Sequence, residues 1–91
     1  MPGNKRYQVK FRKSARKEFL QLPTRIQDKI VEALSFLAEN PFTELLQIKK
    51  LRGPERLYRI RFGDYRLLYT VESFELVLIV IKIGHRREIY R

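Results

Sequence analysis

The chain has 91 residues with no cysteine and one histidine, His85, which excludes disulfides and thiolate metal sites and leaves too few ligands for other metal sites. Lysine and arginine number 20 against 10 acidic residues, and the net charge of +10 predicts a polyanionic partner. A hydrophobic content of 44% suffices for one core, so we expect a single domain, residues 1–91, with no cofactor.

Membrane association is not expected. Residues 1–6 have no apolar stretch behind them, which argues against a signal peptide. The longest apolar run, residues 76–81, is far too short to span a bilayer. No long helix is expected to carry a basic face opposite an aromatic one, so surface binding to a membrane is also disfavoured. A domain without cysteine suits a reducing compartment, and we therefore expect a cytoplasmic protein that binds nucleic acid or an acidic protein.

Two helices are predicted after a first strand. Apolar and polar residues alternate over residues 7–11, as in a half-buried strand near a sheet edge. A short helix capped by Ser14 then runs to a proline. Thr24 caps a second helix in a capping box with Gln27, and apolar residues at helical spacing extend this helix to Asn40. So short a link predicts an antiparallel helical hairpin whose apolar faces cover a sheet.

Residues 57–69 have the pattern of a β-hairpin. Two alternating runs flank Gly63-Asp64, and glycine supplies the positive φ that two-residue turns need. This turn fixes the register of the two strands. Counting outward pairs Phe62 with Tyr65, Arg61 with Arg66, Ile60 with Leu67, Arg59 with Leu68 and Tyr58 with Tyr69.

Paired residues share a face of a sheet, so the hairpin has an apolar and a basic side. The apolar side is expected to pack in the core and consists of Tyr58, Ile60, Phe62, Tyr65, Leu67 and Tyr69. The other side carries Arg59, Arg61 and Arg66. Like charges directly opposite each other weaken a sheet, which suggests that an anion binds between them. The alternative is a solvated face whose arginines extend into water or pair with acids elsewhere.

The remaining segments complete an α+β pattern. Residues 42–56 are expected to form a connection that contains the basic cluster Lys49-Lys50-Leu51-Arg52. The β-branched run 76–81 predicts a central strand buried on both faces. A two-residue turn before it pairs Arg66 with Ile81 and places Arg86 on the face opposite Arg66, whereas a shifted register or a bulge near Gly84 reverses this. The order β-α-α-β-β-β predicts a mainly antiparallel sheet with the helical hairpin on one face.

Four short motifs follow one another at a characteristic spacing. They are Lys50-Leu51-Arg52-Gly53, Tyr58-Arg59-Ile60-Arg61, Gly63-Asp64-Tyr65-Arg66 with Tyr69, and Gly84-His85-Arg86 followed by Tyr90. With these motifs on a β-α-α-β-β-β plan, nearly the whole chain resembles the RelE/ParE superfamily of toxins from toxin–antitoxin pairs. RelE-like members of that superfamily cut mRNA in the ribosomal A site. ParE-like members inhibit DNA gyrase and generally lack the basic set and the terminal tyrosine.

The resemblance implies a catalytic set and favours the RelE branch. By resemblance, the nuclease positions are Arg59, Arg61, Arg66, Arg86 and Tyr90, with Arg52 as an RNA contact. Lys50 and Arg87 are also expected to contact RNA. Well-studied RelE enzymes have lysines where this chain has Arg59 and Arg61. Because arginine does not readily deprotonate, the general base is left open among His85, Tyr90, Lys82 and groups of the ribosome.

The expected reaction is attack of the RNA 2′-hydroxyl on the adjacent phosphate, which needs stabilisation of negative charge, a base and an acid. The resemblance also implies partners, namely the ribosome with its mRNA and an acidic, RelB-like antitoxin in a heterodimer or heterotetramer. Two alternatives remain open from the sequence: a ParE-like gyrase inhibitor and a non-catalytic RNA-binding module.

Overall fold

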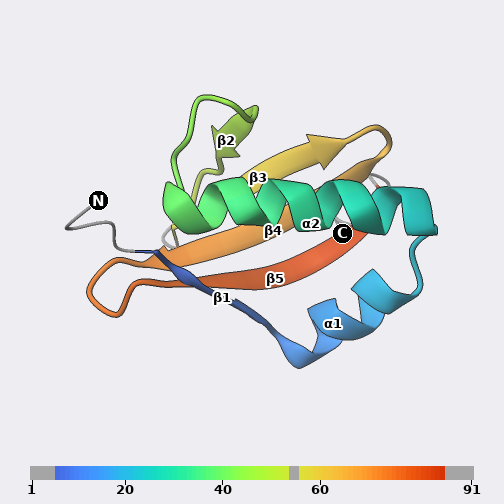
Figure 1. Cartoon of the computed structure of the whole chain (residues 1–91), viewed down its shortest axis with the longest axis horizontal. Coiled ribbons are helices and arrows are strands. Elements are labelled where there is room, and N and C mark those ends of the chain that lie inside the picture. The colour runs from blue at the N-terminus through green and yellow to red at the C-terminus, as the bar shows by residue number, and fades with distance from the viewer. Residues whose placement is uncertain (1–5, 54–55, 86–91) are drawn as a thin grey trace.

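The computed structural model describes residues 6–53 and 56–85, and five strands and two helices lie within them. In chain order these are β1 (Gln8–Phe11), α1 (Lys13–Leu20), α2 (Thr24–Glu39), β2 (Ile48–Lys50), β3 (Leu57–Phe62), β4 (Tyr65–Glu72) and β5 (Val77–His85). The strands form one sheet in the order β1-β5-β4-β3-β2, in which only β1 and β5 run parallel. Figure 1 shows α2 lying across this sheet. The predicted α+β fold is confirmed, with one strand more than expected.

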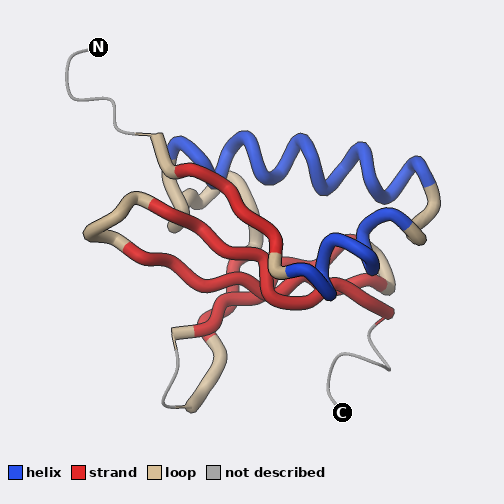
Figure 2. The backbone as a smooth tube through the Cα atoms, turned by 90° about the horizontal axis from the view of Figure 1, so that it is seen from below, coloured by secondary structure: helices blue, strands red, loops and turns tan. Residues whose placement is uncertain are grey.

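The core lies between α2 and the sheet, and Figure 2 shows the two as separate layers. Buried residues of α2 recur at helical spacing, as predicted, and include Ile30 and Leu37, both fully inaccessible to solvent. They pack in one cluster with Leu67 and Tyr69 of the hairpin and with residues of β5. Among the described residues, no helix has the length and apolar character that crossing a membrane would require.

The helix starts differ from the predicted caps. Helix α1 begins at Lys13 and α2 at Thr24, and at neither start does a side chain cap the helix through a hydrogen bond. The proposed Ser14 and Thr24 caps are therefore wrong. Gln27 makes no capping box; its Nε2 donates instead to the carbonyl oxygens of Leu20, at 3.4 Å, and Leu22, at 3.1 Å. These bonds connect the end of α1 to α2 and so hold the turn that links the two helices.

Strand β2 lies within the segment expected to be a plain connection. It pairs antiparallel with β3, and Lys49 stands opposite Arg59. Three residues are too few to show an alternating pattern, and edge strands are often this short because a short edge limits pairing with other chains. The pairing assigns each lysine of β2 to one face of the sheet.

The β3–β4 hairpin has the predicted register, from Phe62 opposite Tyr65 to Tyr58 opposite Tyr69. Gly63 has φ +61°, the left-handed conformation for which a glycine was expected in this turn. Ile60, Leu67 and Tyr69 are buried in the core, as predicted for the apolar side of the hairpin. The opposite side of the hairpin therefore faces away from α2.

The β4–β5 register differs from the two-residue turn. Glu72 pairs with Val77 across a longer turn, in which Leu76 has φ 55°. The ladder then skips Ile81 at a bulge, so that Arg66 pairs with Gly84 rather than with Ile81. The bulge lies before Gly84, at the point where β4 passes from Leu68 to Tyr69. This shift decides which residues of β5 lie on the side of the arginines.

Candidate functional site

The face of the sheet away from α2 carries two rows of basic residues, and we call it the arginine face. One row runs Lys49, Arg59, Leu68 and Lys82 across strands β2 to β5, and the next runs Arg61, Arg66 and Gly84 across β3 to β5. Directly opposed residues have Cα atoms about 4.5–5.5 Å apart, so the cationic side chains of neighbouring strands can reach one common anion. The predicted grouping of Arg59, Arg61 and Arg66 on one face is what the strand pairing produces.

Arg66 is the buried member of this group, with only 7% of its surface exposed. Its Nη1 donates to the carbonyl oxygens of Gly63, at 3.0 Å, and Tyr65, at 3.2 Å, which aims the guanidinium back toward the hairpin turn. Its Nε is buried and has no hydrogen-bond partner among the described residues. No acidic side chain within residues 6–53 and 56–85 forms an ion pair with it. A guanidinium cannot shed its proton, so this charge is costly unless an anion binds there.

The neighbours of Arg66 on the arginine face are two arginines and a glycine. Arg61, directly opposite, is exposed, and Arg59, two residues away along β3 on the same face, is half-buried. On the β5 side the neighbour is Gly84, which has no side chain to fill the space. An exposed arginine, a buried arginine and a glycine thus surround one small area of the sheet, an arrangement that suits a phosphate group.

Lys82 also lies on the arginine face but is already engaged. Its Nζ is 3.7 Å from Oε2 of Glu18 in α1. The other oxygen of the same carboxylate, Oε1, accepts a hydrogen bond of 2.8 Å from the backbone N–H of Ile83. Lys82 therefore serves first as a partner of α1.

His85 lies on the other face of the sheet. It pairs with Tyr65, and the two rings meet edge to face with centroids 5.8 Å apart. The register that pairs Arg66 with Ile81 would have placed His85 on the arginine face, and the bulge reverses this. His85 is therefore not brought together with Arg61 and Arg66.

The tyrosines of the hairpin belong to the core, as expected. Tyr69 is fully buried, and its hydroxyl donates a hydrogen bond of 2.8 Å to the carbonyl oxygen of Pro41. Burial raises the pKa of Tyr69 far above its ordinary value, and the neighbouring Tyr58 adds to this effect. Tyr58 and Tyr65 are partly buried against the same core. None of the three is a stacking platform on the arginine face.

The other expected RNA contacts are placed unevenly. Lys50 pairs with Tyr58 and so belongs to the α2 side of the sheet edge, while Arg52 is exposed just beyond β2. Lys49, not Lys50, joins the arginine face; recognising β2 would have revealed this through the alternation of its side chains. The predicted residues Arg86, Arg87 and Tyr90 lie outside the described residues.

The fold agrees with the comparison to known proteins. Residues 9–90 match the family described as the ParE toxin of type II toxin–antitoxin systems, parDE. The chain belongs to this family. Relatives of the RelE type are similar to this chain along almost its full length.

The mRNA interferase toxin RelE of Escherichia coli K12 is 32% identical over 88 residues, which cover 92% of this chain and 90% of the relative. Toxin RelG of Mycobacterium tuberculosis is 32% identical over 87 residues, covering 93% and 97%. A chain of the archaeal RelE–RelB complex of Pyrococcus horikoshii superposes with a TM-score of 0.78 at 32% identity, covering 90% of this chain and 97% of that one. This toxin is therefore RelE-like in sequence and in fold.

Proposed function

We propose that this chain is the toxin of a toxin–antitoxin pair and acts in the cytoplasm as an endoribonuclease that cuts mRNA in the ribosomal A site. The observation that carries the proposal is Arg66, a buried guanidinium with an unpartnered Nε and no acidic partner in the described part of the chain. An RNA phosphate supplies the anion that this side chain lacks. The RelE relative of Escherichia coli K12, named an mRNA interferase, supports mRNA as the substrate.

In the proposed reaction the 2′-hydroxyl oxygen bonds to the adjacent phosphorus and the bond from phosphorus to the 5′-oxygen breaks. One product ends in a 2′,3′-cyclic phosphate and the other begins with a 5′-hydroxyl. A base takes the proton of the 2′-hydroxyl, and an acid gives one to the leaving 5′-oxygen. Arg61 and Arg66 stabilise the charge that builds up on the phosphate oxygens, a role that needs no metal ion.

Proton transfer needs a different group, because arginine remains charged. His85 lies on the opposite face of the sheet, and Lys82 is paired with Glu18. We therefore propose that Tyr90 or groups of the ribosome move the protons. Dependence on the ribosome follows from this proposal, since the described part of the arginine face binds and polarises a phosphate but supplies no base beside it.

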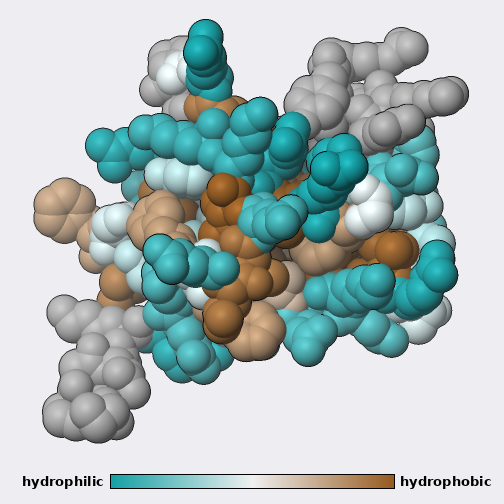
Figure 3. Space-filling view, turned by 90° about the horizontal axis from the view of Figure 1, so that it is seen from above, coloured by the Kyte–Doolittle hydropathy of each residue, from teal (hydrophilic) through white to brown (hydrophobic). Residues whose placement is uncertain are grey.

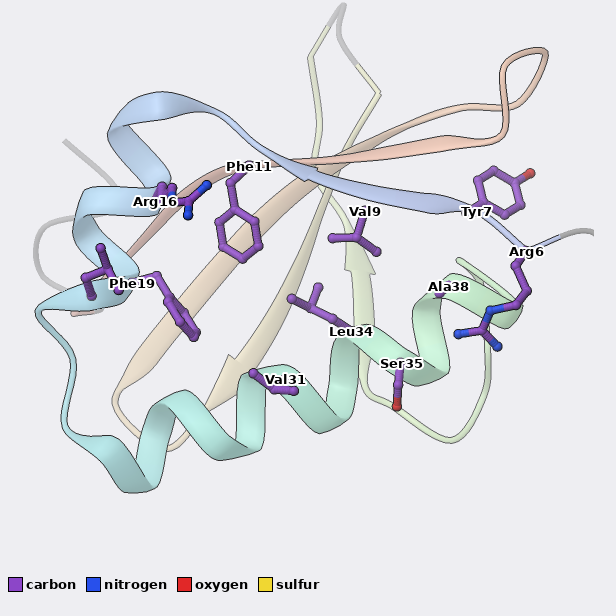
Figure 4. A pocket seen from close by; sticks show the side chains of 11 residues that line it. Arg6, Tyr7, Val9, Phe11, Arg16, Phe19, Val31, Leu34, Ser35 and Ala38 are labelled. Atoms are coloured by element: carbon purple, nitrogen blue, oxygen red, sulfur yellow. The ribbon is translucent and has the colours of Figure 1, made fainter.

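The proposed partner is an acidic, RelB-like antitoxin, which forms a heterodimer or heterotetramer with the toxin. A groove of about 580 Å³ lies between β1, α1 and α2, and Figure 4 shows apolar side chains, among them Phe11, Phe19 and Leu34, turned into it. Leu20 and Val31 at this groove are 64% and 56% exposed. Arg16 lines the groove together with Arg6, whose Nη1 is 3.0 Å from Oε2 of Glu39. An amphipathic acidic segment therefore matches the groove in polarity and, at Arg16, in charge.

The test is to map mRNA ends by primer extension after induction of the toxin. The wild type is expected to produce cuts in translated messages, and Arg66→Ala and Arg61→Ala are expected to abolish them. Arg25→Ala is the matched control, because Arg25 is an exposed arginine of α2, on the other layer. Purified toxin should cut the same message when ribosomes are present and leave it intact without them. An unbroken message in translating cells would overturn the proposal.

A second function, inhibition of DNA gyrase, is favoured by one observation, the match to the ParE family. It predicts loss of gyrase supercoiling activity in vitro and growth arrest that survives Arg61→Ala and Arg66→Ala. The RelE-like proposal predicts that the same substitutions restore growth, so one set of variants separates the two functions.

A further inference from the structure

A carboxylate of α1 is bonded to the end of β5, although the two are far apart in the chain. Oε1 of Glu18 accepts a hydrogen bond of 2.8 Å from the backbone N–H of Ile83. Oε2 of the same side chain lies 3.7 Å from Nζ of Lys82. Glu18 follows the fully buried Ala15 by three residues, a spacing that puts both on the same side of the helix. An acidic residue that faces inward from a helix is uncommon, and here both of its oxygens have partners.

Glu18 bonds to β5 just beyond the point where the neighbouring strand β1 ends. Strand β1 pairs with β5 only from Val77 to Val80, and the N–H of Arg12 closes that ladder by donating to the carbonyl oxygen of Val80. Strand β1 ends at Phe11, opposite Val80, and the chain then forms α1. Figure 2 shows this helix following directly after β1 at the edge of the sheet. The outer side of β5 would be open there, with unpaired N–H groups. Glu18 supplies the acceptor that a further residue of β1 would otherwise provide.

The bulge of β5 lies at the same point. The ladder between β4 and β5 skips Ile81, directly after the last residue that β1 holds. A bulge changes the direction and the facing of the strand that follows it. Here that strand is residues 82–85, and its facing places Gly84 beside Arg66 and turns His85 to the opposite side. Strand β4 pairs with one edge of this segment, and the hydrogen bond from the Ile83 N–H to Glu18 holds its other edge.

We propose that Glu18 is a positioning residue of the phosphate site: it fixes residues 82–85 beyond the bulge, in the register that sets Gly84 beside Arg66. The inference rests on the proposed endoribonuclease function. Glu18 itself contacts no substrate. Its effect passes through the backbone of β5, which forms one border of the area around Arg66 and leads into the segment that contains Arg86.

Two substitutions separate the hydrogen bond from the charge. Glu18→Ala removes the acceptor for the Ile83 N–H together with the ion pair to Lys82. Glu18→Gln removes the charge but keeps a carbonyl oxygen at the same place. Glu32→Ala is the matched control, because Glu32 is an exposed glutamate of α2 whose carboxylate has no hydrogen-bond or ion-pair partner among the described residues.

The first measurement is amide hydrogen exchange by NMR on the purified, folded toxin. In Glu18→Ala the Ile83 amide should exchange about tenfold faster than in the wild type, while core amides such as that of Leu67 keep their rates. In Glu18→Gln and Glu32→Ala the Ile83 amide should exchange as in the wild type. Unchanged exchange at Ile83 in Glu18→Ala would overturn the inference, since the Glu18–Ile83 hydrogen bond would then not stabilise this part of β5.

The second measurement is cleavage of a ribosome-bound message by the same proteins. Glu18→Ala should lower kcat about tenfold, which corresponds to about 1.4 kcal/mol, with KM close to the wild-type value. Glu18→Gln should restore kcat, which a general loss of stability would not explain. Faster exchange at Ile83 with wild-type kcat would show a purely structural bond and overturn the positioning role. A wild type that cuts no message refutes the proposed function and the positioning role that depends on it, whereas the exchange data still decide whether Glu18 holds β5.

Discussion

Arg61 and Arg66 stand directly opposite each other on adjacent strands, and one is exposed while the other is 7% exposed. Two guanidinium groups in this relation repel each other, and like charges directly opposite each other destabilise a sheet. The buried member donates to carbonyl oxygens of its own hairpin turn, which fixes its orientation. The exposed member remains free to follow a ligand. The pair therefore consists of one guanidinium with a fixed orientation, that of Arg66, and one that can move, that of Arg61. A different prediction follows for each.

Through Arg66, the binding of an anion should raise the stability of the folded chain. Because the Arg66 guanidinium is already ordered and lacks a counterion among the described residues, inorganic phosphate is expected to bind the folded chain in preference to the unfolded one and to raise Tm. In Arg66→Ala this rise should disappear, and in Arg66→Lys it should shrink, because an ammonium cannot reproduce the planar fork. Differential scanning calorimetry over a phosphate series measures the effect. Arg25→Ala should respond as the wild type does; an equal rise in Arg66→Ala would place phosphate elsewhere.

Arg61, the exposed arginine of the pair, should contribute to RNA binding mainly through its charge. Arg61→Ala is expected to weaken the binding of a short single-stranded RNA and to reduce the slope of log K against log salt by about 0.7, the value for one phosphate contact. Fluorescence anisotropy at several salt concentrations gives both quantities. Arg61→Lys should keep the slope, since it keeps the charge. A slope that is the same for Arg61→Ala and the wild type would exclude a phosphate contact at this position.

Much of this site follows from the sequence because one turn determines it. Gly63 and Asp64 fix the register of the hairpin, and the register alone places Arg59, Arg61 and Arg66 on one face. The β4–β5 connection has no comparable signal. Its turn depends on a leucine, Leu76, in a left-handed conformation, and a bulge shifts the ladder once more.

The facing of two predicted site residues could not be read from the sequence because those signals are missing. The bulge at Ile81 exchanges the faces of the residues after it, so His85 lies away from the arginines although its position in the chain suggested otherwise. The shortness of β2 concealed that Lys49 rather than Lys50 faces the same way as Arg59. In both cases the side of the sheet is what differs, and a shift of one residue exchanges the two sides.

The buried hydroxyl of Tyr69 should contribute to stability and leave cleavage unchanged. Tyr69→Phe leaves the carbonyl oxygen of Pro41 without its donor and is expected to lower the free energy of unfolding by about 1–2 kcal/mol. Urea denaturation measures this difference, and cleavage of a translated message should proceed at the wild-type rate. Tyr7→Phe, at a partly exposed tyrosine, is the control and should change stability little. A loss of cleavage in folded Tyr69→Phe would assign this residue to the site after all.

The same residue predicts how stability depends on high pH. Burial raises the pKa of Tyr69 above that of an unfolded tyrosine, about 10, so the unfolded chain loses this proton first as the pH rises. The stabilisation is complete below pH 10 and is lost as the pH rises from there toward the folded-state pKa. Tyr69→Phe lacks this proton, and its stability should fall less steeply than that of the wild type above pH 10. Equal slopes would show that Tyr69 ionises alike in both states.

The groove between β1, α1 and α2 should bind the antitoxin through its apolar residues. Leu20→Glu is expected to weaken the complex at least tenfold, because it removes apolar contact area and repels an acidic segment. Leu45→Glu is the matched control: Leu45 is 73% exposed, similar to the 64% of Leu20, but lies outside this groove. Calorimetric titration of each toxin with the cognate antitoxin gives the affinities. Cleavage should persist in Leu20→Glu even when antitoxin is present, because neutralisation fails while the arginine face is intact. Equal affinities for the two variants would move the antitoxin to another surface and leave this groove without its proposed occupant.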